Sequence, residues 1–174
     1  MDLFLCLDGS DILLPGILVS CLACLLEKVR DDAADEVASY AGIGIGLATL
    51  LRATPFRLIH DEIPIPAELL RPNFPIKQLF GGQENTLGEA DEAEWYAAVE
   101  QMATTASAHL TKAQELQAQL PPSGRPVLLP MVPALQFLER LQANKYNLMD
   151  DQLHQPLPLQ LMLRLGRGWL MGRV

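Results

Sequence analysis

The residues of this chain that could do chemistry are mainly acidic side chains in pairs. Asp31 and Asp35 have the i, i+4 spacing that places two carboxylates one helical turn apart. Two such turns on facing helices can hold magnesium ions and a bound diphosphate. Only small residues and a third aspartate separate this pair, and no second motif faces it. We therefore interpret Asp31 and Asp35 as the solvated first turn of a helix.

Cysteine offers a second possible chemistry. Cys21 and Cys24 form a C-x-x-C pair, a spacing that is found in redox and zinc sites. With Cys6 the chain contains three thiols, whereas tetrahedral zinc needs four ligands. We interpret the pair as reduced, buried cysteines within the apolar run Ile17–Leu26.

Histidine and glycine patterns do not predict a catalytic or cofactor site. The three histidines, His60, His109 and His154, are far apart on separate expected elements. Gly42, Gly44 and Gly46 are followed by no lysine, as a phosphate-binding loop would require. We expect the glycines to mark close helix–helix contact, and we predict no catalytic residue, cofactor or metal.

The elements that must position these residues are helices. Apolar residues recur every three or four positions in several segments, and we expect five or six helices and no strand. The expected helices are Ile17–Arg30, about Asp31 to Arg52, Pro66–Arg71, Ala90–Leu120, Pro133–Ala143 and Pro156–Leu170. The second should end near Arg52 because Pro55 disfavours helix at the residue before it. The predicted fold class is all-α.

Composition narrows the possible functions. The chain has 174 residues, of which 49% are hydrophobic, so we expect one domain over residues 1–174. A net charge of −8 argues against nucleic-acid binding. Asp2, Asp8 and Asp11 precede the first basic residue, so no mitochondrial presequence is visible. Ile12–Leu26 is shorter than a bilayer core and is expected to be a buried helix or an in-plane one.

The segment Tyr40–Pro55, YAGIGIGLATLLRATP, is the most informative in the chain. With its surroundings, Ala38–Leu70, it resembles the squalene/phytoene synthase family of prenyltransferases. In those enzymes a helix of this layout is followed by a basic segment and a "YLP" element. The residues that hold this frame are Gly42, Leu47, Leu50, Leu51 and Arg52, with Ile63-Pro64 or Ile65-Pro66 near the expected "LP".

The resemblance is closer to a non-enzymatic mitochondrial branch of that family, which serves the assembly of respiratory complex I. Leu51–Pro55 reads LRATP, as that branch does. The later elements follow in the same order, at His109-Leu110, Phe137–Gln142 and Leu157–Leu161. The resemblance implies a partial isoprenoid-synthase-like helical bundle that corresponds to the carboxy-terminal half of the family fold and lacks the amino-terminal half.

The departures from the enzymes fall on the metal motif. The two metal-binding aspartates of the family would lie at Ala53 and Arg57. A methyl group and a guanidinium in place of two carboxylates would remove two ligands and add a cation, and Mg²⁺ depends on few protein ligands. The resemblance therefore implies a degenerate metal motif and a protein that is not an enzyme.

The resemblance implies that the protein is a non-catalytic scaffold, accessory subunit or assembly factor. It would serve a mitochondrial inner-membrane respiratory complex, and complex I is the expected one. The expected partners are protein subunits of that complex and a separate chain that supplies the other half of the fold. The expected location is the matrix side of the mitochondrial inner membrane.

Two alternatives stay open. One is a prenyltransferase half whose metal site is completed by a partner chain, with Asp61 or Glu62 replacing the lost ligands. The other is a peripheral protein that contacts a lipid surface or a partner through the basic, apolar carboxy-terminal helix. The candidate contact residues there are Arg164, Arg167 and Trp169.

Overall fold

A computed structural model describes residues 32–60, 64–72, 74–75, 88–120, 125–150, 153 and 158–171. The α-helices of this part are α2 (Asp32–Ile59), α3 (Glu89–Leu116), α4 (Met131–Ala143) and α6 (Pro158–Met171). Three short 3₁₀ helices accompany them, η1 (Ala67–Leu69), η3 (Gln117–Gln119) and η4 (Arg125–Leu128). The described residues contain no β-strand, so the predicted all-α class is confirmed. The predicted helix Ile17–Arg30 and the three cysteines lie outside the described residues.

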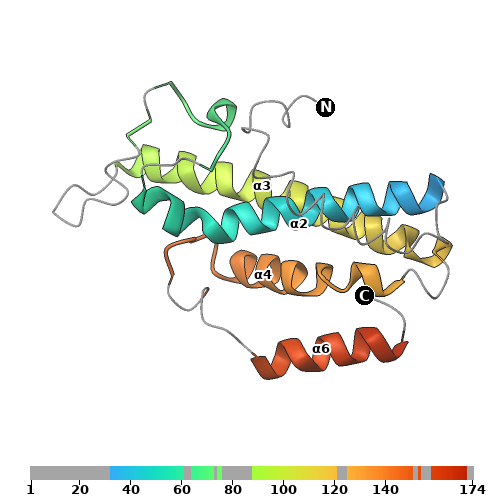
Figure 1. Cartoon of the computed structure of the whole chain (residues 1–174). Coiled ribbons are helices and arrows are strands. Elements are labelled where there is room, and N and C mark those ends of the chain that lie inside the picture. Colours follow the sequence, from blue (N-terminus) through green and yellow to red (C-terminus); the bar gives the residue numbers. More distant parts are fainter. Residues whose placement is uncertain are drawn as a thin grey trace.

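The helices form a layered bundle in which the chain reverses direction from each helix to the next (Figure 1). α2 and α3 run side by side and make the most extensive contact between elements. α4 packs on both of them, and α6 lies against α4 on the side away from α2 and α3. The main core is therefore shared by α2, α3 and α4.

The apolar stripe of α3 behaves as its spacing predicts. Trp95, Val99, Met102, Ala106, Leu110 and Ala113 are all buried. They pack in one hydrophobic cluster with residues of α2 and α4 such as Leu51 and Leu141. Burial of this stripe accounts for the stability of a 28-residue helix.

Gly44 allows α2 and α3 to approach closely. A Cβ atom built on Gly44 would lie 2.6 Å from the Cδ2 and Cγ atoms of Leu110 and 3.1 Å from the carbonyl oxygen of Ala106. Real side chains essentially never come this near, so only glycine fits at this point of the contact. Gly42 and Gly46 are buried in the same helix. The predicted role of this glycine run in helix packing is thus confirmed at Gly44.

The predicted end of α2 at Arg52 is wrong. The helix continues through Pro55 to Ile59, and Leu58 in this extension is buried in the core. Proline removes one backbone N–H and so leaves the carbonyl of Leu51 without its usual helical donor. One residue earlier, the buried hydroxyl of Thr54 donates a hydrogen bond to the carbonyl oxygen of Leu50 at 2.9 Å. Burial of the last turn prevails over the local preference of the residue before proline.

Other helix boundaries lie close to their predicted positions. α4 begins at Met131, before the expected Pro133, so that this proline falls in the first turn, where it is tolerated. The expected helix at Pro66–Arg71 is the shorter 3₁₀ turn η1. α3 passes into η3 and ends before the expected proline-rich joint.

α2 is also the one described helix with the length and hydropathy of a membrane span, over Ala34–Ile59. Within the bundle, 61% of its apolar window is buried against other helices. A central core helix has the same composition, and the packing of α2 against α3 and α4 supports that interpretation.

Candidate functional site

The two positions that the resemblance assigns to metal-binding aspartates lie on one face of α2. Ala53 and Arg57 are four residues apart in the helix, one turn from each other, and both are partly exposed. Arg57 thus places a guanidinium one turn beyond a methyl group. Among the described residues, no group of three His, Cys, Asp or Glu side chains is placed to bind a metal ion.

The acidic pairs occupy separate places. Asp35 is exposed in the first turns of α2, as expected for a solvated amino-terminal turn, while Asp31 lies outside the described residues. Asp61 and Glu62 are also outside them, so their proposed replacement of metal ligands stays a prediction. Asp91 lies in the first turn of α3, where a carboxylate is stabilised by the helix dipole.

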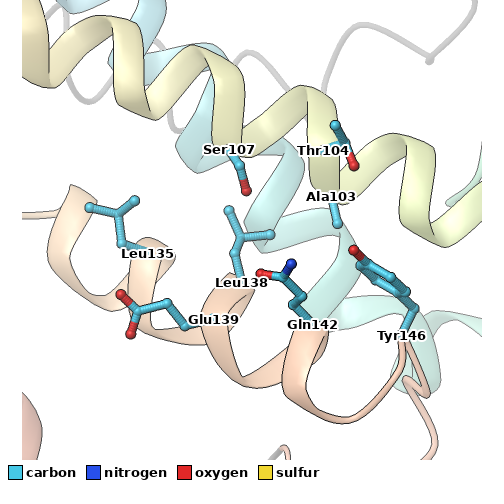
Figure 2. Close-up of a pocket in the computed structure, with 8 residues that line it drawn as sticks. All are labelled: Ala103, Thr104, Ser107, Leu135, Leu138, Glu139, Gln142 and Tyr146. Atoms are coloured by element: carbon cyan, nitrogen blue, oxygen red, sulfur yellow. The ribbon is translucent and has the colours of Figure 1, made fainter.

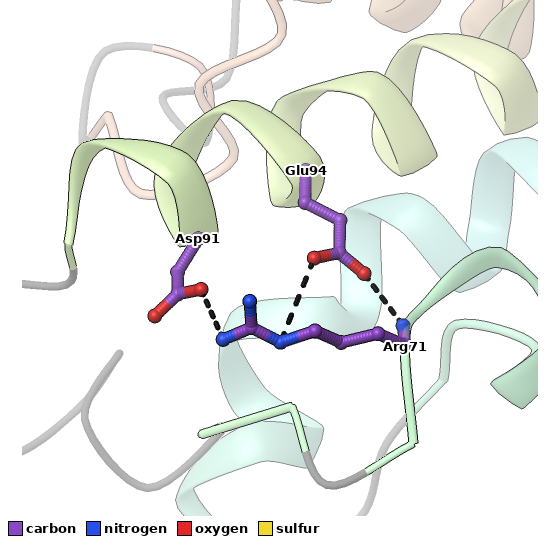
Figure 3. A network of polar contacts seen from close by, with 3 residues as sticks. All are labelled: Arg71, Asp91 and Glu94. Atoms are coloured by element: carbon purple, nitrogen blue, oxygen red, sulfur yellow. Dashed lines mark hydrogen bonds and ion pairs between the residues drawn. The ribbon is translucent and has the colours of Figure 1, made fainter.

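Asp91 belongs to a polar network that fixes the chain after η1 to the start of α3 (Figure 3). The Arg71 guanidinium forms an ion pair with Asp91 and a longer contact of 3.9 Å with Glu94. The backbone N–H of Arg71 also donates a hydrogen bond to the Glu94 carboxylate at 2.5 Å. Beside this network Phe74 stacks on Trp95, with ring centroids 6.3 Å apart. These contacts are structural, because they join the chain after η1 to the first turns of α3 (Figure 3).

A pocket of about 230 Å³ lies between α3 and α4 (Figure 2). Its lining is formed by Ala103, Thr104, Ser107, Leu135, Leu138, Glu139, Gln142 and Tyr146. The pocket offers hydroxyl, amide and carboxylate groups over an apolar floor, and it contains no basic side chain. A diphosphate needs cations or a carboxylate-bound metal pair, so this lining does not match one. The volume is also below the usual range of small-molecule sites.

Tyr146 lies at one end of this pocket, in the turn that terminates α4. Burial raises the pKa of the Tyr146 phenol, and the nearby carboxylate of Glu100, which also accepts its hydrogen bond, raises it further. Lys145 and Tyr146 have left-handed φ angles of 52° and 62°. The Tyr146 N–H bonds the carbonyl of Leu141 at 2.9 Å, and the Lys145 N–H bonds that of Gln142 at 3.1 Å. This is the Schellman pattern of a helix end.

The described histidines are not brought together. His60 is exposed and meets the ring of Phe56 edge-on, with centroids 4.7 Å apart. His109 lies on α3 against the ring of Tyr40 on α2, at 5.7 Å. Burial lowers the pKa of the His109 imidazole. His154 lies outside the described residues.

The carboxy-terminal contact residues lie on α6. Arg164 is exposed and forms an ion pair of 2.8 Å with Glu139, which also lines the α3–α4 pocket. Arg167 is exposed, and Trp169 belongs to the helix, although its side chain is not described. The structure therefore places these residues on one element, a different helix from α2, which carries Ala53 and Arg57.

Sequence reasoning missed the pocket and the Arg71 network. Both join residues that are distant in the sequence, and neither shows a motif. The acidic first turn of α3 is visible in the sequence, but the helix dipole alone accounts for it, so it does not identify Arg71 as a partner.

Comparison with known proteins gives one family and a consistent set of relatives. The squalene/phytoene synthase family matches residues 16–162. A rat protein named "NADH dehydrogenase (ubiquinone) complex I, assembly factor 6" is 27% identical over 142 residues, covering 80% of this chain and 41% of its own length. The human protein of the same name is 27% identical over 143 residues, with the same coverage. A Drosophila homolog is 35% identical over 127 residues, covering 71% of this chain and 36% of its own length.

The chain thus spans about two fifths of the length of the curated relatives it matches. No solved structure matches it.

Proposed function

The chain belongs to the squalene/phytoene synthase family, and we propose that it acts in the assembly of respiratory complex I as a non-catalytic helical protein. The observation that carries this proposal is its likeness to relatives from rat, human and Drosophila that are all named complex I assembly factor 6. Their agreement across distant animals favours this branch of the family over the enzymes.

The absence of catalysis is proposed from the chemistry of two positions. By the resemblance drawn from the sequence, Ala53 and Arg57 occupy the places of metal-binding aspartates. A methyl group at one ligand position removes a carboxylate, and a cation at the other opposes Mg²⁺ binding by charge repulsion. The α3–α4 pocket, which carries Glu139 and no basic group, is no substitute diphosphate site.

We propose that the protein works by contact, in the mitochondrion and at the matrix side of the inner membrane, where complex I is built. Its proposed partners are complex I proteins together with the sequence that corresponds to the rest of the longer relatives, on this or on a separate polypeptide. Phe56 and Ile59 support a contact role, because both are large, apolar and more than two-thirds exposed at the end of α2.

The direct test is removal of the protein from the cells that make it. Native gel electrophoresis of their mitochondrial membranes should show a loss of mature complex I and an accumulation of subassemblies. Re-expression of the wild-type protein should restore the mature complex. Normal complex I in cells that lack the protein would contradict the proposal.

A second measurement addresses the enzymatic alternative. The protein, purified natively with its associated chains, is incubated with Mg²⁺ and prenyl diphosphates. We expect no release of pyrophosphate above a heat-denatured control. Turnover that depends on Mg²⁺ would show instead that a partner chain completes an active prenyltransferase.

A further inference from the structure

Among the described side chains of the four α-helices, those of α6 are the least buried. None of its side chains from Leu161 to Arg167 is buried, and only Leu161 and Leu165 are partly covered. Figure 1 shows the helix at the edge of the bundle, where α4 is its principal neighbour. The covered residues are four apart, so a single narrow stripe of α6 faces α4.

Among the described residues, one exposed ion pair joins α6 to α4, beside the partly covered Leu161 and Leu165. Arg164 and Glu139 approach to 2.8 Å, and their side chains are 47% and 58% exposed. Water and salt screen a pair of this kind, so it contributes little to holding the helix in place. The described side chains of α6 therefore constrain its position on the bundle only weakly.

The exposed face of α6 carries large apolar side chains in the part of the helix whose side chains are described. Met162 and Leu163 are 70% and 65% exposed, and they are two of the five large hydrophobic side chains that are exposed in the described part of the chain. Gly166 follows one turn later on the same face and adds no polar group. One apolar face of α6 packs on its own bundle and another is exposed to water. An exposed apolar face of this kind marks a site where a second apolar surface binds.

The charge of α6 indicates which kind of surface its exposed face binds. The protein has a net charge of −8, yet the helix Pro158–Met171 contains two arginines and no acidic residue. Arg167 lies one turn after Leu163, at the border of the exposed apolar face. Apolar side chains bordered by arginine suit the boundary between lipid headgroups and acyl chains, where the stem of arginine is buried and its guanidinium meets phosphate.

We infer that the outer face of α6 binds an anionic lipid surface. Met162 and Leu163 enter the acyl boundary, and Arg167 meets the headgroup phosphates. Arg164 can stay with Glu139 or exchange this carboxylate for a lipid phosphate, since the pair is exposed. This binding does not depend on the role in complex I assembly; that role bears only on which membrane is bound.

The test is sedimentation of the purified full chain with vesicles of phosphatidylcholine, alone or with phosphatidylglycerol. We expect binding to the anionic vesicles that weakens as salt is raised. The double substitution Met162→Gln/Leu163→Gln should weaken it by more than about tenfold, because two apolar side chains leave the lipid. Arg167→Gln should weaken it about fivefold on anionic vesicles and not on neutral ones.

Matched controls lie on α2. Phe56→Gln/Ile59→Gln removes an equally exposed apolar pair, whose proposed contact is with protein and not with lipid. Arg52→Gln removes an exposed arginine. Neither change should alter vesicle binding, and circular dichroism verifies that every variant is folded. The inference is overturned if the wild-type chain does not bind anionic vesicles, if the α6 variants bind as the wild type does, or if the α2 variants lose binding equally. Capture of a complex I protein by α6 without vesicle binding would assign the face to a protein partner and would also overturn it. Because complex I levels are not measured, failure here leaves the assembly proposal standing.

Discussion

At the scale of single residues, Gly44 sets the distance between the two longest helices. Its Cα faces Leu110, which is fully buried, and the backbone carbonyl of Ala106. The glycine run could be interpreted correctly from the sequence because a helix tolerates glycine only at a cost of about 1 kcal/mol relative to alanine. Which of the three glycines makes the contact depends on how α2 is rotated about its axis relative to α3. The spacing of the glycines does not determine that rotation.

Gly44→Ala should destabilise the protein. The new methyl group would lie 2.6 Å from Leu110 atoms and would force α2 and α3 apart. Overpacking of this kind costs about 1–3 kcal/mol, and the better helix propensity of alanine offsets up to about 1 kcal/mol. Urea unfolding should show the net loss. Gly166→Ala is the matched control, because nothing lies within 4 Å of its Cβ position, and it should cost no stability. Equal stability of Gly44→Ala and wild type would contradict the close contact.

His109 makes stability depend on pH. Burial lowers its pKa in the folded protein, so below the ordinary histidine value of about 6.5 the unfolded chain binds the proton more readily. The contribution to stability is fully present above that value and is lost as pH falls through the folded pKa. Thermal unfolding between mildly alkaline and mildly acidic pH should show this decline.

A comparison of variants assigns the pH effect to His109. His109→Gln should flatten the part of the decline that lies just below pH 6.5, the ordinary value. His60→Gln changes an exposed imidazole and controls for the loss of one histidine. An unchanged pH profile in His109→Gln would contradict the assignment.

At the scale of elements, the helix ends show where local rules were insufficient. α2 passes through Pro55 because Leu58 is buried one turn beyond it, and the residue-pair rule that predicted an end at Arg52 cannot include that tertiary contact. α4 ends through left-handed Lys145 and Tyr146, a position at which glycine is usual. No glycine marks this turn in the sequence, so its Schellman geometry could not be predicted.

Lys145→Gly should stabilise the protein. The left-handed conformation costs a residue with a Cβ atom about 1–2 kcal/mol, and glycine relieves it while adding some unfolded-state entropy. We expect a net gain of about 0.5–1 kcal/mol in the free energy of unfolding. Lys112→Gly, in the interior of α3, is the matched control and should lose about 1 kcal/mol instead. Changes of opposite sign in the free energy of unfolding at the two positions would show that the left-handed conformation of Lys145 causes the gain. A loss of stability in Lys145→Gly would refute this explanation.

At the scale of the whole molecule, the helices of the bundle could be predicted from periodicity, whereas the contacts between them could not. The stripe from Trp95 to Ala113 specified a buried helix because one face of α3 is apolar throughout. The α3–α4 pocket and the Arg71 network depend on how separate elements meet, which no local pattern states. The placement of Ala53 and Arg57 on one helical face followed from their spacing, whereas their metal-free role is an inference from family resemblance.

The unequal burial of the helices also predicts how the molecule opens. α2, α3 and α4 share one core, whereas α6 is attached by a partly covered stripe and an exposed ion pair. Segments with few buried apolar contacts open locally at a free energy well below that of global unfolding. Hydrogen exchange followed by mass spectrometry should therefore show fast exchange across Pro158–Met171 and slow exchange in the centre of α3. Anionic vesicles should slow the exchange of α6 and leave that of α3 unchanged, because lipid covers the exposed apolar face of α6. Protection of α6 equal to that of α3 without lipid would mean that the helix is integral to the core and would contradict both its loose attachment and its availability to a membrane.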